Sequence, residues 1–147
     1  MIPEAEYIEK TITVRDMRLP VEVTLTKKSL IRWLALALGL INPRESRRAV
    51  LDLIEVLMDG QLQTGKGMTV DEIMGRLDNK YSEKTVRYHL LRMERKGIVN
   101  RDKGVYSLRI SDYDSRDITA IINEYDRSYQ RAMAKIRDAL QKLKGMY

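Results

Sequence analysis

The most constraining feature of the sequence is a dense series of helix and turn signals over residues 68–110. Thr69 and Glu72 have the spacing of a capping box, which predicts that a short helix begins beside them. Ser82 predicts the N-cap of a second helix, and Gly97 predicts its end. Because only a short turn separates the two helices, the segment predicts a helix-turn-helix.

The second predicted helix is followed by the signals of a β-hairpin. Within the helix, Val86, Leu90 and Met93 recur at helical spacing and predict its buried face. Residues 98–99 begin a strand, and residues 102–104 are typical of a tight turn. Apolar side chains then alternate along a return strand that ends near Ile110. The pattern predicts two short helices and a hairpin around one apolar core.

The charge of the chain is concentrated in the same segment. The net charge is +6 at pH 7, and residues 76–109 account for all of it with ten basic and four acidic side chains. An element that displaces counterions from phosphates concentrates cations in this way, whereas a surface that only meets solvent scatters them. The alternative interpretation is chance clustering on a solvated face.

The N-terminal part of the chain predicts a hairpin and two helices. Apolar and polar residues alternate over 8–14 and 19–25, which predicts a β-hairpin that packs on a buried helix over 29–41. A further helix is expected over 43–59, ending at Gly60 before a flexible loop. Three cations at the start of that helix could hold an anion: Arg44, Arg47 and Arg48.

The C-terminal part of the chain predicts one long helix from about residue 115 to 144. Its apolar residues recur at alternating spacings of four and three, a heptad pattern that is typical of a helix pairing with another helix. We expect this arm to form a homodimer; the alternative is that it packs back on its own domain. The predicted pairing residues are Ile118, Ile122, Tyr125, Tyr129, Ile136 and Leu143.

These elements together resemble the winged helix-turn-helix family of transcriptional regulators, with residues 82–99 (SEKTVRYHLLRMERKGIV) as the main match. The long C-terminal helix is similar to the dimerisation helices of PadR-like and ArsR-like regulators. The sequence as a whole predicts a mainly α-helical fold with small β-hairpins, in three parts, of which the first is an elaboration that belongs to neither of these regulator groups. The parts are an N-terminal hairpin and helix (1–42), a winged helix-turn-helix (43–111) and a long coiled-coil helix (112–147).

The face of the second helix that lies opposite its core residues predicts an interface with double-stranded DNA. A helix fits the major groove, where Arg87 and Tyr88 could read bases while other cations hold phosphates. We exclude Arg95 and Lys96, since the helix dipole stabilises cations in the last turn in any case. The predicted DNA-binding residues are Lys80, Ser82, Lys84, Thr85, Arg87, Tyr88, Arg92, Arg101 and Lys103.

Catalytic and metal-binding patterns are missing from the sequence. It has no cysteine, no glycine-rich phosphate loop and one histidine, His89, which is expected to pack beside Leu90. We therefore expect no enzyme activity, no metal and no cofactor. The chain shows neither a secretory signal nor the roughly 20 apolar residues of a membrane span, so a cytoplasmic location without membrane contact is expected.

Taken together, the sequence predicts a sequence-specific DNA-binding transcriptional regulator that acts as a homodimer. The alternative is a winged helix used as a protein-interaction module in a transcription, replication or chromosome-organising assembly. Such a module would not need cations on the face that enters a groove, so the basic residues favour DNA. The sequence carries no signal for or against a small-molecule effector.

Overall fold

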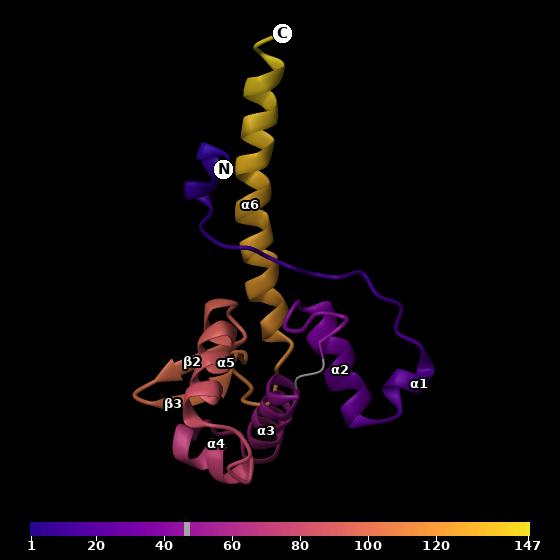
Figure 1. Cartoon of the computed structure of the whole chain (residues 1–147). Helices are drawn as coiled ribbons and strands as arrows, with labels where there is room; N and C mark the ends of the chain where they lie inside the picture. The colour runs from indigo at the N-terminus through magenta and orange to yellow at the C-terminus, as the bar shows by residue number, and fades with distance from the viewer. Residues whose placement is uncertain (46–47) are drawn as a thin grey trace.

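A winged helix forms the base of the molecule, and one long helix rises from it (Figure 1). The computed structural model describes residues 1–45 and 48–147. In chain order the elements are a 3₁₀ helix, η1 (Pro3–Tyr7), followed by α1 (Val21–Thr24), α2 (Lys27–Ala37), α3 (Ala49–Thr64), β1 (Met68–Thr69), α4 (Val70–Arg76), α5 (Glu83–Arg95), β2 (Val99–Asp102), β3 (Val105–Leu108) and α6 (Ala120–Lys144).

The small sheet is antiparallel, with strand order β1-β3-β2. Its hairpin, the wing, pairs Val99 with Leu108 and turns at Lys103 and Gly104. Both turn residues have positive φ angles, +51° and +78°, as the tight turns that match the twist of a hairpin require. The wing is confirmed. The two-residue strand β1 was not predicted, because so short a strand leaves no alternation to detect.

The core lies where α3, α4 and α5 pack together and against the sheet. Its most deeply buried side chains include Leu53 of α3, Ile73 of α4, Leu90 of α5 and Leu108 of β3. The predicted capping box at the start of α4 is present, with the Thr69 hydroxyl accepting from the amide of Glu72 at 3.2 Å. Side-chain caps and the shared apolar core therefore specify α4 and α5 together, whereas α3 has no side-chain cap at its start.

The predicted N-terminal hairpin is wrong. Residues 8–20 run extended without strand pairing, and the chain then turns into the short helix α1 after Pro20. The hydrogen bonds of Arg15 hold this segment in place of strand pairing. Its amide donates to the Ala37 carbonyl at 2.8 Å, and its guanidinium donates to the Leu36 and Ile41 carbonyls. The extended segment is thus held by the C-terminal end of α2, and no second strand is available to pair with it.

Helices α2 and α3 are present with shifted bounds. Helix α3 does not stop at Gly60 but continues to Thr64, so the predicted flexible loop is shorter than expected. Gly60 serves close packing, because a Cβ there would lie 2.7 Å from the Met68 Cε atom. The helix begins at Ala49 rather than at Pro43, and Arg47 lies outside the described residues.

Helix α6 is divided between two roles along its length. Its first turns pack on the domain through Ile121, Tyr125 and Ser128, and the Tyr125 hydroxyl donates to the Leu38 carbonyl at 2.9 Å. Beyond Ser128 the helix projects from the base, with the N-terminal segment alongside it (Figure 1). The heptad prediction is therefore corrected at Tyr125, whose side chain is used inside its own domain.

The other five predicted pairing residues also differ in burial according to their place along the chain. Ile118 packs partly against the core, whereas the other four are exposed along the helix: Ile122, Tyr129, Ile136 and Leu143. Among the residues described, no helix combines the length and apolar character needed to cross a membrane.

Candidate nucleic-acid interface

The outward face of α5 is a continuous stripe of exposed side chains. Its members, Lys84, Tyr88, Leu91 and Arg95, follow one another at spacings of four, three and four, which places them on one side of the helix. Tyr88 is 57% exposed and Leu91 is 43% exposed. The opposite side, including Val86 and the other core residues, is buried. The stripe is thus free to meet another molecule.

Arg87 of α5 and Arg101 of the wing line one cleft. The cleft is open to solvent, has a volume of about 390 Å³, and is also lined by Thr69 at the end of β1 and Asp71 in the first turn of α4. Arg87 also forms an exposed ion pair, in which its Nε atom lies 3.1 Å from Glu83 Oε2. Two predicted DNA-binding cations, far apart in the sequence, are therefore brought together by the packing of the wing against α5.

Ser82 and Thr85 form the cap of α5. The Ser82 hydroxyl accepts from the Thr85 amide at 3.1 Å and donates to the Thr85 hydroxyl at 2.9 Å. The two side chains are exposed or half-exposed at the start of the helix, where backbone amides point outward. Lys80, just before this cap, and Lys103, at the tip of the wing, are exposed as well.

Arg92 does not join the exposed stripe as predicted. Its guanidinium lies over the ring of Tyr88, 5.8 Å from the ring centroid, and donates to the Leu40 carbonyl at 3.4 Å. The side chain is half-buried and turned toward the end of α2. Arg92 therefore supports Tyr88 in position, and sequence spacing alone gave no sign of the Leu40 carbonyl as its partner.

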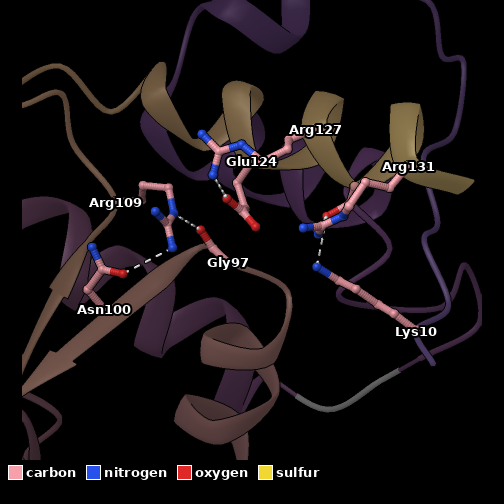
Figure 2. Close-up of polar contacts among 8 residues, drawn as sticks. Lys10, Gly97, Asn100, Arg109, Glu124, Arg127 and Arg131 are labelled. Atoms are coloured by element: carbon pink, nitrogen blue, oxygen red, sulfur yellow. Dashed lines mark hydrogen bonds and ion pairs between the residues drawn. The ribbon is translucent and has the colours of Figure 1, made fainter.

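Arg109 is a second cation of the basic segment that has a structural partner. Figure 2 shows its side chain reaching the turn after α5, where the Nε atom donates to the Gly97 carbonyl at 2.5 Å. A second nitrogen donates to the Asn100 side chain at 3.1 Å. The segment's charge of +6 is therefore only partly displayed to solvent, since Arg92 and Arg109 stabilise the fold.

Leu91 and Arg95 lie on the exposed face of α5 but are not among the predicted DNA-binding residues. Arg95 was excluded because of its place in the last turn of the helix, and the sequence analysis assigned Leu91 no role. Their spacing from Lys84 and Tyr88 was the available signal, since it puts all four on one helical face.

A second basic region lies at the C-terminal end of α5. A shallow cleft of about 470 Å³ is lined there by Arg92, Arg95 and Lys96 together with Lys10 of the N-terminal segment. Burial lowers the pKa of Lys96, and the nearby cations Arg92 and Lys10 lower it further. Lys10 is also held in place, because its Nζ atom donates to the Ser128 hydroxyl at 3.0 Å.

His89 is buried within α5, 7% exposed, with its ring edge-on to that of Tyr88. Its placement agrees with the expected packing role. In the described part of the chain, no three histidine, aspartate or glutamate side chains gather where they could hold a metal ion.

Comparison with known families identifies the domain that carries these residues. The model of the Ribonuclease R winged-helix domain matches residues 53–119, which include most of α3, the sheet, α4, α5 and the loop before α6. Searches of curated proteins and of solved structures found no match. The chain thus contains a winged-helix domain, a nucleic-acid-binding or interaction module.

Proposed function

We propose that this protein is a sequence-specific double-stranded DNA-binding transcriptional regulator that acts as a homodimer. The observation that carries the proposal is the convergence of Arg87 and Arg101 on one cleft between α5 and the wing. A helix and a hairpin that present cations side by side match a duplex, whose major groove admits a helix and whose phosphates flank it.

The residues of α5 have different roles in this proposal. Arg87 pairs bidentately with a guanine, and Tyr88 and Thr85 contact a thymine methyl or a phosphate. Lys84, Ser82 and Lys80 hold phosphates and fix the register. The Glu83 ion pair does not prevent this, because an exposed pair contributes at most about 1 kcal/mol and its arginine can exchange partners.

The wing and α6 complete the proposal. Arg101 and Lys103 reach the backbone or the minor groove beside the recognition helix. Helix α6 joins two copies, as in PadR-like and ArsR-like regulators, so that two half-sites are read by one molecule. The proposal includes a cytoplasmic location and neither catalysis nor a cofactor.

The competing function is a winged helix that binds RNA or protein. The family match favours considering RNA, since its description names a ribonuclease. Single-stranded RNA is held mainly by stacking on aromatic side chains, and the exposed stripe of α5 offers one, Tyr88, among cations. The two arginines that line one cleft between α5 and the wing favour a duplex instead.

Salt dependence of binding tests the proposal directly. We expect the affinity for a random DNA duplex to fall by at least about tenfold between 50 and 200 mM salt, because several phosphates are neutralised by each subunit. Single-stranded RNA of equal length serves as the competing ligand. Tighter binding of RNA than of duplex, or a flat response to salt, would contradict the DNA proposal.

A pair of substitutions tests the assigned roles. Arg87→Ala is expected to lose about 1–3 kcal/mol on a duplex selected from a random pool and little on random duplexes, whereas Lys84→Ala weakens both alike. Arg127→Ala is the matched control, because Arg127 is an exposed arginine paired with a glutamate on α6. Equal losses for Arg87→Ala on both kinds of duplex would show that Arg87 does not read bases.

A further inference from the structure

The projecting part of α6 carries a stripe of exposed apolar side chains. Ile122, Tyr129, Ile136, Leu140 and Leu143 are each between 49% and 60% exposed. Their spacings of seven, seven, four and three place them on one face, and Met133 falls between them in the same heptad frame. An isolated helix of this length is marginal in water, so the stripe indicates a missing packing partner.

An apolar cavity lies at the base of the same helix. Its volume is about 270 Å³, and its lining includes Leu34 of α2, Leu38 just after that helix, Met58 of α3, Ile118 just before α6 and Ile122 in the first turn of α6. The cavity is partly open to solvent, so an apolar side chain from outside can enter it, and exposed apolar surface of this kind marks a binding site. Since Ile122 belongs to both the cavity and the exposed stripe, the two form one continuous apolar surface.

The charges along this region indicate which partner fits the surface. Residues 111–126, around the base of α6, carry five acidic and one basic side chain, whereas residues 135–147, at its far end, carry four basic and one acidic. A second copy laid antiparallel brings each basic end against an acidic base. A parallel pair would instead place Asp126, which lies in the stripe's frame, against its own copy.

We propose that two copies pair through antiparallel α6 helices and that each helix fills the cavity at the base of the other. Ile122 packs against the partner's Leu140, and Tyr129 packs against the partner's Met133. Leu143 of each copy enters the partner's cavity, and Asp126 lies beside the partner's Arg137. The pairing deepens the proposed function, since it supplies the homodimer on which that function rests.

Disulfide cross-linking tests the geometry, because the chain has no cysteine of its own. Ile122→Cys mixed with Leu140→Cys is expected to give a cross-linked dimer under mild oxidation. Each variant alone should not, because the two copies of residue 122 lie about 27 Å apart along the helices in this arrangement. Cross-linking of Ile122→Cys with itself, or no cross-linking of the mixture, would overturn the proposal.

The oligomeric state of surface variants provides an independent measurement. Leu140→Glu should raise the dimer dissociation constant by at least about tenfold, because it places a charge in an apolar interface. Gln141→Glu is the control: it adds the same charge at the neighbouring exposed position, outside the stripe, and should leave the constant nearly unchanged. Helix content from circular dichroism verifies that both variants are folded.

The alternative occupant of the cavity is an apolar small molecule. If the wild-type protein sediments as a monomer and binds the dye 8-anilinonaphthalene-1-sulfonate, with the dye lost on Ile118→Arg substitution, the pairing is overturned. All these measurements are made without DNA. A dimer that binds no duplex would therefore support the pairing while contradicting the proposed function.

Discussion

At the scale of single residues, Gly97 connects the interface to the long helix. It has a φ angle of +80°, which ends α5 and directs the chain into the wing. A Cβ atom there would collide with the side chain of Glu124 of α6, which lies against it (Figure 2). The absence of a side chain thus serves both the turn and the approach of α6.

Gly97→Ala is expected to lower the free energy of unfolding by about 2–4 kcal/mol, since backbone strain and overpacking act together. Chemical denaturation measures the change. Gly104→Ala is the matched control, with a similar φ of +78° but no atom near the added Cβ, and should lose only about 1 kcal/mol. Equal losses for the two variants would show that the Glu124 contact contributes nothing.

Two tyrosines are predicted to ionise late. The hydrogen bond that Tyr81 donates to Asp52, with some desolvation and the charge of Asp52, raises its pKa to about 12. Burial raises the pKa of Tyr125 to about 12. Because the unfolded chain ionises these groups near pH 10, their contribution to stability is complete below pH 10 and is lost as the pH rises toward 12.

An absorbance titration of the folded protein should therefore show a contribution near pH 12 from Tyr81 and Tyr125. Tyr81→Phe and Tyr125→Phe should each remove part of it. Circular dichroism at each pH verifies that the fold is intact. If neither substitution changed the absorbance near pH 12 in a folded protein, both environments would be contradicted.

At the scale of elements, the exposed face of α5 continues from the first turn of the helix to Arg95 in its last turn. Arg95→Ala should weaken binding to all duplexes alike and reduce the slope of affinity against salt by about one unit, as expected for a phosphate contact. Arg109→Ala is the comparison, because that side chain is bound to the Gly97 carbonyl and should change stability instead. An unchanged slope for Arg95→Ala would restrict the interface to the first turns of α5.

At the scale of the whole molecule, α6 belongs both to the domain and to the arm. A chain cut after about residue 114, near the start of the predicted coiled-coil part, would lose the buried Ile121 and Tyr125. Because α6 projects from the domain beyond Ser128 (Figure 1), a truncation that removes only the projecting arm ends at about residue 131. We expect residues 1–131 to be folded and monomeric, and residues 1–114 to be markedly less stable, by thermal unfolding and sedimentation. A dimeric 1–131 chain would place the interface elsewhere.

The sequence by itself determined the winged helix because the signals there are local and agree. Thr69 and Ser82 cap helices, Gly97 ends one, and Lys103 and Gly104 turn the wing, each through contacts within a few residues. The basic character of the segment was readable for the same reason. These features depend on neighbours along the chain, so spacing was enough.

Only the tertiary structure decided which of these residues face outward. Arg92 and Arg109 donate to backbone carbonyls outside their own elements. Tyr125 fits the heptad pattern, but it is buried and donates to the Leu38 carbonyl at the end of α2. The alternating N-terminal segment is held by Arg15 at that same helix end instead of pairing as a hairpin. A periodic pattern shows that a face will be covered, but the covering partner is set by packing between distant segments.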